Sequence, residues 1–151
     1  MGARDNGAIP PVGTTARRTR TVSRQDIVLF TEMTGDRNPL HYDEELAAST
    51  RFGGIIVQGG VTSGLLNAIV AEDLPGPGTV FLSVSWTFQA PVRPGDEITA
   101  EVEVLEVHAA KPVARLRTTI TNGHGVTVLD GEAHVYRVPL DRPMGTEVVS
   151  G

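Results

Sequence analysis

The sequence contains no cysteine, and this absence removes several kinds of chemistry at once. Disulfide bonds, thiolate nucleophiles and cysteine-based metal sites are excluded. No apolar run reaches the roughly 20 residues that a membrane-spanning helix needs, and residues 1–15 lack the apolar stretch of a secretion signal. We therefore expect a cytoplasmic protein that does not insert into a membrane.

Signatures of several common functional sites are also absent. No glycine-rich phosphate loop follows a strand-like run, and the chain has no Gly-x-Ser-x-Gly elbow of the kind that carries a serine nucleophile. Three histidines lack the spacing of metal ligands: His108, His124 and His134. We therefore expect no bound metal.

The formal net charge of -5 favours solubility and argues against broad nucleic-acid binding. Basic residues nevertheless cluster at one place near the N-terminus: Arg17, Arg18 and Arg20. We interpret this cluster as part of a solvated face, and a phosphate contact is the less favoured alternative.

The chain has 151 residues, of which 40% are hydrophobic, and this suits one domain with a substantial core. Residues 1–15 are polar and are interrupted by glycine and proline, so we expect a flexible N-terminal tail. We expect a second tail over residues 141–151, which contains Arg142-Pro143 near its start. The single domain then covers residues 16–140.

The first half of this domain has the spacing and end signals of helices. Ser23 is a good helix N-cap, Asp26 nearly completes a capping box, and Gly35 suits the left-handed residue that ends a helix. The helix between these ends carries an apolar stripe near helical spacing: Ile27, Phe30, Thr31 and Met33 or Thr34. A short helix is predicted over residues 44–48, and a third over about Gly60 to Glu72. Apolar residues of the third recur at helical spacing: Val61, Leu65, Leu66, Ile69 and Val70.

The second half changes to a period of two, which predicts strands. Strand-like runs cover residues 80–88, 97–108, 113–121 and 126–138. The last two runs are separated by Asn122-Gly123, a strong hairpin signal. With a short strand near residues 18–22, the layout predicts an α+β fold in which a curved antiparallel sheet wraps around one central helix. Two aromatic residues of the first run, Trp86 and Phe88, are predicted to lie in the core.

Residues 34–43 form a glycine- and proline-containing loop that holds the side chains best suited to catalysis. Asp36 and His41 are five residues apart across a turn, so both can point into one small volume. Histidine exchanges protons near neutral pH, and a neighbouring carboxylate can hold a water, orient the imidazole or carry a second proton. Asn38 can fix the loop by bonding main-chain groups, and we also expect it to contact the substrate. Spacing alone leaves an ordinary solvated turn as the alternative.

Larger patterns around this loop resemble the MaoC-like family of hot-dog proteins, whose best-understood members are R-specific enoyl-CoA hydratases. The resemblance runs from about Thr21 to Val138. Its most specific part is Gly-Asp-x-Asn-Pro-x-His-x-Asp at residues 35–43. Further matches are Arg-Phe-Gly-Gly-Ile-Ile-Val-Gln-Gly at 51–59, Phe-x-x-Pro-Val-x-x-Gly-Asp at 88–96 and Gly-Glu-Ala at 131–133.

This resemblance implies a hot-dog fold and a hydro-lyase. Asp36 and His41 would form a dyad that holds a water and adds it to the double bond of a trans-2-enoyl thioester, giving the (R)-3-hydroxyacyl thioester, or catalyses the reverse dehydration. The substrate is a thioester of coenzyme A or of a carrier protein, and no cofactor is expected. The resemblance also implies at least a homodimer, with the substrate tunnel at or near the contact between subunits.

Negative charge develops on the thioester oxygen during this reaction, and preorganised N–H groups stabilise it. The turn formed by Gln58, Gly59 and Gly60 at the start of the central helix can supply them, because glycine permits close approach and a helix N-terminus favours negative charge. We expect Gly59 to be the donor, and the alternative is that these glycines only make a tight turn.

Two positions depart from the family pattern. Many members have histidine where this chain has Gln58. Well-studied hydratases also have a serine in the active-site wall, where counting places Gly64 in this chain. Ser63 is one position early and faces elsewhere on a helix.

Two other functions remain open at this stage. Hot-dog domains also host thioesterases, and a fold does not fix a function. Some MaoC-like domains lose the dyad and act as non-catalytic subunits that bind thioesters or assemble with partners, although both residues are present here.

Overall fold

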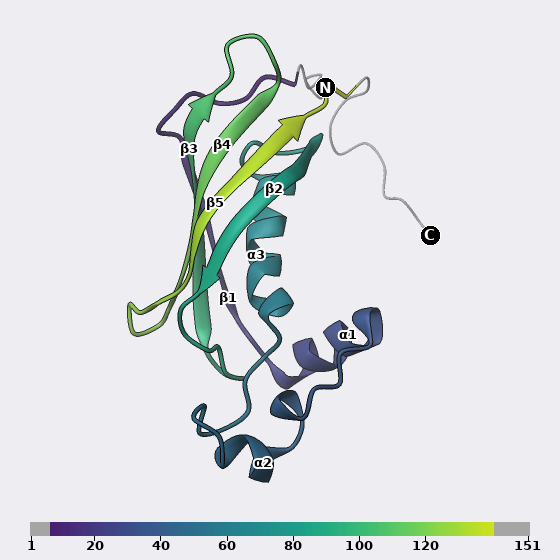
Figure 1. Ribbon diagram of the computed structural model, residues 1–151. Coiled ribbons are helices and arrows are strands. Elements are labelled where there is room, and N and C mark those ends of the chain that lie inside the picture. Colours follow the sequence, from purple (N-terminus) through teal and green to yellow (C-terminus); the bar gives the residue numbers. More distant parts are fainter. Residues whose placement is uncertain (1–6, 141–151) are drawn as a thin grey trace.

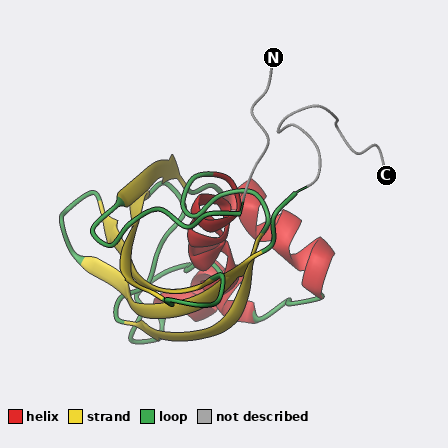
Figure 2. Ribbon diagram, turned by 90° about the horizontal axis from the view of Figure 1, so that it is seen from above, coloured by secondary structure: helices red, strands yellow, loops and turns green. Residues whose placement is uncertain are grey.

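The structure, a computed structural model, describes residues 7–140. A five-stranded antiparallel sheet curves around one long helix, α3 (Gly59–Glu72), and three short helical segments lie at one end of this sheet (Figure 1). Seen from above, the sheet wraps around α3 (Figure 2). The predicted α+β plan is confirmed. The predicted tail 141–151 lies outside the described residues.

The strands are β1 (Thr15–Thr21), β2 (Thr79–Phe88), β3 (Glu97–Val107), β4 (Val113–Asn122) and β5 (Thr127–Arg137). Their order in the sheet is β1-β3-β4-β5-β2, so β1 and β2 are its two edges. All neighbouring pairs are antiparallel. The predicted strands are present, with β1 beginning three residues before the predicted start.

The remaining helices are α1 (Arg24–Thr34), the 3-10 helix η1 (Pro39–His41) and α2 (Glu44–Ala48). At the start of α1, the Ser23 N–H donates to Asp26 Oδ2 at 2.8 Å, as the capping box predicts. Gly35 ends the helix with a φ of 83°, a conformation that glycine adopts without a steric penalty.

The core lies between α3 and the concave face of the sheet. On β3 the predicted alternation is confirmed, since every second side chain is buried against the helix: Ile98, Ala100, Val102 and Val104. Leu66, Ile69 and Val70 of α3 face them from the other side. Burying each leucine, isoleucine or valine side chain stabilises the fold by roughly 1.5–3 kcal/mol.

Strand β2 does not follow the simple alternation. Its pairing with β5 shifts register between Phe81 and Ser83, so Phe81 and Trp86 both pack against the core in a T-shaped contact with ring centroids 6.0 Å apart. The prediction that Phe88 lies in the core is wrong, because 53% of it is exposed. The extra residue at this shift explains why Phe81 and Trp86, five positions apart, share a face. Phe88 lies beyond the shift and is the last residue of β2.

The hairpin between β4 and β5 is present, but its turn is longer than the Asn-Gly signal suggests. Asn122 Oδ1 accepts from the N–H groups of His124 and Val126. The left-handed residue is Gly125, with a φ of 76°, rather than Gly123. The asparagine side chain thus organises a loop of four residues, an arrangement that the dipeptide alone does not predict.

The arginine cluster of β1 is engaged with carboxylates. Arg17 pairs with Glu101, Arg18 with Asp73 and Arg20 with Asp26. These pairs support the interpretation of a solvated, charged face.

The described part of the predicted N-terminal tail contacts the folded body. The Gly13 N–H donates to Val104 O at 2.9 Å, and Ile9 packs against the core. In residues 7–140, no helix is long and apolar enough to cross a membrane.

Candidate active site

The loop that follows α1 brings Asp36 and His41 together. Gly35 reverses the chain, and η1 then turns it back so that His41 faces Asp36. The closest approach joins His41 Nε2 to Asp36 Oδ2 at 3.7 Å. This separation is too long for a direct hydrogen bond. It therefore leaves both atoms available to a small polar molecule such as water.

The second ring nitrogen of His41 fixes the tautomer. Nδ1 lies 2.7 Å from Ile56 O, and a carbonyl oxygen only accepts hydrogen bonds, so Nδ1 carries the proton. In the neutral imidazole, Nε2 is then a free acceptor directed toward Asp36. His41 is buried while Asp36 is partly exposed, so the pair lies at a boundary between the interior and solvent.

Main-chain bonds hold the loop in this shape. Asp36 Oδ1 accepts from the Asn38 N–H at 3.1 Å, and Asn38 Oδ1 accepts from the Leu40 N–H at 3.1 Å. Asn38 therefore fixes the loop, as proposed from the sequence. Its predicted contact with substrate stays a prediction.

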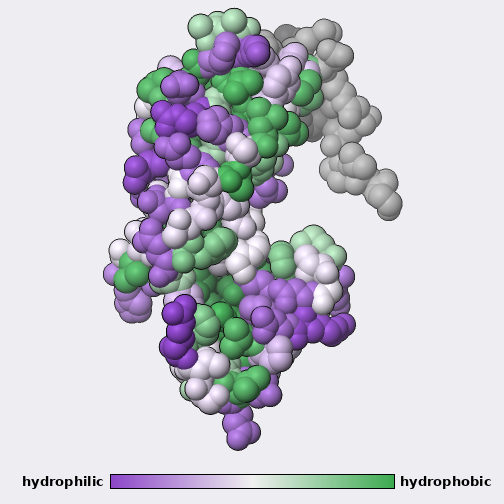
Figure 3. Space-filling view, in the orientation of Figure 1, coloured by the Kyte–Doolittle hydropathy of each residue, from purple (hydrophilic) through white to green (hydrophobic). Residues whose placement is uncertain are grey.

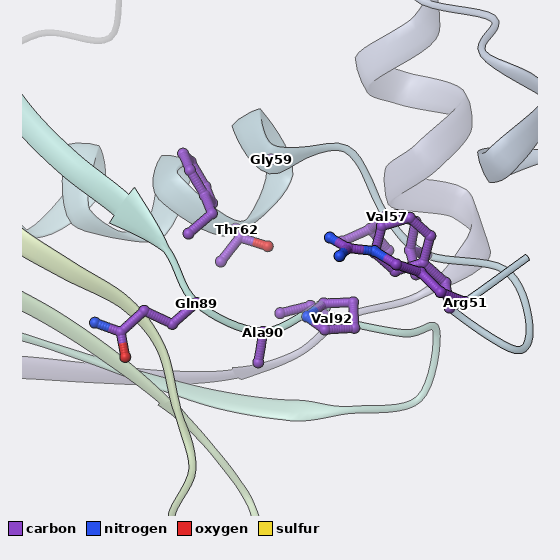
Figure 4. A pocket seen from close by; sticks show the side chains of 11 residues that line it. Arg51, Val57, Gly59, Thr62, Gln89, Ala90 and Val92 are labelled. Carbon is purple, nitrogen blue, oxygen red and sulfur yellow. The ribbon is translucent and has the colours of Figure 1, made fainter.

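A pocket of about 320 Å³ lies beside the start of α3. Gly59 and Thr62 face it from the helix, Ala90 and Val92 close the opposite side, and the Arg51 side chain extends past Val57 at one end (Figure 4). The described lining does not include Asp36 or His41. Ile56 connects the pocket to His41, because it lines the pocket and its carbonyl oxygen accepts the hydrogen bond from His41 Nδ1.

The N-terminus of α3 lies at this pocket, which Gly59 lines. The first amides of a helix have no partner within the helix, and Gly59 is the first residue of α3. A side-chain carbon at Gly59 would lie 3.2 Å from the Phe88 ring, so this position is tight. The predicted donor is thus placed at the pocket, while its role in catalysis stays a prediction.

The other two predicted glycines lie on a different face of α3. A side-chain carbon at Gly60 would come within 2.2 Å of Phe30, so this glycine permits α1 to pack against α3. Gly64 faces open space in a groove between α1 and α3 that is also lined by Leu29 and Met33. The described structure therefore places Gly60 and Gly64 away from the pocket at Gly59.

The Gln58 side chain is likewise turned away from the pocket. It is 2% exposed, and Nε2 donates to Ile27 O at 3.1 Å and to Thr31 Oγ1 at 3.2 Å. Thr31 and Tyr42, which contact each other, were not recognised as site residues from the sequence. The available signal was a polar side chain, Thr31, in the apolar stripe of α1.

Charge around the start of α1 is organised by Asp26. Burial raises the pKa of this carboxyl, but the Ser23 N–H and the Arg20 guanidinium stabilise the charged form more, so the pKa lies below its ordinary value. No group of three or more acidic or histidine side chains within residues 7–140 is arranged to hold a metal ion.

Comparisons with known proteins agree with this architecture. Residues 8–126 match the MaoC like domain family. The 3-hydroxybutyryl-CoA dehydratase of Methylorubrum extorquens is 47% identical over 128 residues, which cover 85% of this chain and 80% of that protein. The (R)-specific enoyl-CoA hydratase of Aeromonas caviae is 39% identical over 128 residues, which cover 85% and 95%.

Among solved structures, the (R)-hydratase from A. caviae involved in PHA biosynthesis superposes with a TM-score of 0.81. It is 37% identical to this chain, and the match covers 85% of this chain and 98% of that structure.

A curved antiparallel sheet around one central helix defines a hot-dog domain, and Asp36 faces His41 in the loop after α1. The chain belongs to the MaoC-like domain family. The predicted fold and family are confirmed, as is the hydratase and dehydratase class of enzyme.

Proposed function

We propose that this protein hydrates trans-2-enoyl thioesters to (R)-3-hydroxyacyl thioesters, and catalyses the reverse dehydration. The observation that carries the proposal is the 3.7 Å gap between His41 Nε2 and Asp36 Oδ2, with Nε2 free to accept a proton. The substrate class and the R configuration are supported by the names of the relatives, an (R)-specific enoyl-CoA hydratase and a 3-hydroxybutyryl-CoA dehydratase.

A water that lies beside the two atoms, within hydrogen-bond distance of both, would donate one hydrogen bond to each residue. As its oxygen bonds to the β-carbon, the water gives a proton to the pair, with Nε2 as the supported acceptor. The pair then returns one proton to the α-carbon, so the net reaction adds H₂O across the double bond. Water is the only co-reactant, and the proposal includes no cofactor.

The enolate oxygen needs a hydrogen-bond donor while the β-carbon is attacked. The Gly59 N–H is suited to this role because Gly59 lines the pocket, its N–H lies at the positive end of α3, and it has no main-chain partner among residues 7–140. Arg51 at the end of the same pocket provides a positive charge for the phosphates of the carrier group.

The test is to follow the absorbance of the conjugated thioester with crotonyl-CoA and longer enoyl-CoA substrates. The product is then offered to dehydrogenases specific for R or for S hydroxyacyl-CoA. We expect loss of absorbance and oxidation by the R-specific enzyme alone. A product accepted only by the S-specific enzyme would contradict the assignment.

A thiol reagent in the same assay addresses the thioesterase alternative. Hydration leaves the thioester bond intact, so no free coenzyme A should be released. Thiol release at the rate at which the double bond disappears would instead support hydrolysis.

We also propose that the active form is a homodimer joined at β2. An unpaired strand edge favours pairing with another chain. This edge strand also carries several exposed apolar side chains: Val80, Leu82, Val84 and Phe88. Apolar residues gather near the upper end of β2 in Figure 3. Phe88 also lines the pocket, which would bring the pocket close to the contact.

Val84→Lys tests the dimer, with Val126→Lys as its control. Both valines are 47% exposed, but Val84 lies on β2 and Val126 lies in the hairpin between β4 and β5. We expect Val84→Lys alone to shift the protein to a monomer in sedimentation and to reduce turnover. A wild-type protein that is monomeric and fully active at micromolar concentration would refute the dimer.

A further inference from the structure

The hydroxyl of Thr31 joins three parts of the molecule. It contacts Asp36 O at 2.7 Å, the Tyr42 hydroxyl, and Gln58 Nε2 at 3.2 Å. Thr31 itself is only 3% exposed, so these contacts are shielded from solvent. The three contacts connect α1 to the loop that holds Asp36 and His41, and to Gln58, the residue before Gly59.

Counting protons assigns a direction to each bond. A hydroxyl has one proton and two lone pairs. The Asp36 carbonyl only accepts, so Thr31 donates its proton there. The Gln58 amide nitrogen only donates, so one Thr31 lone pair accepts from it. The other accepts from Tyr42, whose one proton goes to the nearer Thr31 oxygen rather than to Ile27 O at 3.5 Å. The hydrogen-bonding capacity of Thr31 is therefore fully used.

The orientation of the Gln58 amide follows from the same count. The second amide hydrogen goes to Ile27 O at 3.1 Å. If the amide were flipped, the Gln58 oxygen would face Ile27 O, and two acceptors would meet without a proton between them. The Gln58 oxygen is left buried and without a partner among the described residues. A buried acceptor without a partner lowers stability. The glutamine nevertheless keeps the orientation that bonds Thr31.

Both members of the acid–base pair are thus anchored to one short segment, residues 56–58. His41 is held by Ile56 O, and the Asp36 main chain is held through Thr31 by Gln58. The next residue is Gly59, which begins α3 and lines the pocket.

We propose that Thr31 is a positioning residue that sets the Asp36 carboxylate relative to His41 and to the Gly59 amide. The proposal rests on the hydratase function above. Thr31 does not touch the reacting atoms. It acts through Asp36, and its partner Gln58 stands where many family members have histidine.

The decisive variant is Thr31→Val, which removes the hydroxyl and nearly keeps the shape. Because small displacements of a catalytic group are costly, we expect kcat for crotonyl-CoA to fall about tenfold or more while KM changes less than about twofold. The control is Thr118→Val, which removes another buried hydroxyl, bonded to Trp86 Nε1 at 2.9 Å. It should lower the Tm and leave kcat near the wild-type value.

Two further variants separate positioning from folding. Thr31→Ser keeps the hydroxyl and should restore most of kcat. Gln58→Met keeps the side-chain length but removes the donor to Thr31, and we expect a fall in kcat of about threefold or more. If Thr31→Val does not fold, Gln58→Met decides.

A readout without substrate is the NMR shift of the Asn38 amide, which donates to Asp36 Oδ1. It should move in Thr31→Val and in Gln58→Met, but not in Thr118→Val. If the wild type is active, and if the folded Thr31→Val and Gln58→Met variants keep both its kcat and its Asn38 shift, the positioning role is wrong and the hydratase function stands. An inactive wild type would refute the hydratase function, and the Asn38 shift would still test the positioning.

Discussion

Two regions of this molecule are held together by different forces. The sheet region consists of β1–β5 with α3, and its interior is almost entirely apolar. The helical region runs from α1 to residue 57 and lies at one end of the sheet (Figure 1). It contains Asp36 and His41, the proposed acid–base pair, and has few buried apolar side chains of its own: Ile27, Ala47, Ile55 and Val57.

Short-range polar bonds compensate for this small core. Asn38, Asp43 and Thr50 each accept a main-chain N–H two or three residues further on. Such bonds fix the direction of a loop without burying much surface. The sheet region thus supplies the stability of the fold, while the helical region fixes polar side chains at the boundary with solvent, where water is available as a reactant.

The largest effect expected from this division is on turnover, in the helical region. Asp36→Asn removes the charge and His41→Ala removes the imidazole. Each should reduce kcat roughly a hundred- to ten-thousand-fold, the usual contribution of acid–base catalysis. The Tm should change little. Both are measured with enoyl-CoA hydration and thermal melts.

Asp130→Asn and His124→Ala are suitable controls, since both residues lie on the β4–β5 part of the sheet, far along the chain from the loop. They should retain wild-type turnover. Near-normal activity in either Asp36→Asn or His41→Ala would show that the pair is not the catalytic one.

The opposite pattern is expected in the sheet region. Leu116 on the central strand β4 is fully buried, and Leu116→Ala should lower the free energy of unfolding by about 2–5 kcal/mol because it removes packing and leaves a cavity. Turnover below the melting range should persist. Leu46→Ala in α2 makes the same deletion at an exposed position and should change the Tm only slightly. Equal shifts in the two variants would contradict the comparison.

The sequence predicted local features well in both regions. The capping box at Ser23, the left-handed Gly35 and the alternation along β3 depend on residues a few positions apart. All the residues that produce each of these features lie within one short stretch of sequence, so the features can be predicted without knowing the fold.

Features that depend on distant residues were missed. The register shift in β2 depends on pairing with β5, and it places Phe81 on the same face as Trp86. Phe88 is exposed at the end of the same strand, where it lines the pocket. Thr31 was read as part of an apolar stripe because its partner Gln58 is 27 positions away. The predicted nearness of Asp36 and His41 came from their loop, but the tautomer of His41 depends on Ile56 O, 15 positions away.

The smallest predicted effect compares one carboxylate of each region. The Asp26 carboxylate caps the start of α1 and pairs with Arg20, whereas Asp73 is the C-cap residue of α3 and its carboxylate pairs with Arg18 of β1. The hydrogen bond from Arg18 holds the pKa of Asp73 below its ordinary value, and the pKa of Asp26 is also lowered. A carboxyl whose pKa is lower in the folded state adds stability above its unfolded pKa, and this is lost as the pH falls through the folded value.

Asp26→Asn and Asp73→Asn should therefore each lower the Tm at pH 7, and the difference from wild type should shrink below about pH 4, near the ordinary pKa of aspartate.

High salt should weaken the two carboxylates' contributions to stability unequally. The Asp73 side chain is 32% exposed and its pair with Arg18 is open to screening, whereas the Asp26 side chain is 8% exposed and also accepts the Ser23 N–H. At about 1 M NaCl, where the screening length is roughly 3 Å, the Asp73→Asn effect should nearly vanish and the Asp26→Asn effect should persist. Thermal melts by circular dichroism from pH 3 to 7, at low and high salt, measure both, and equal screening of the two would show that the Ser23 bond adds nothing to the cap.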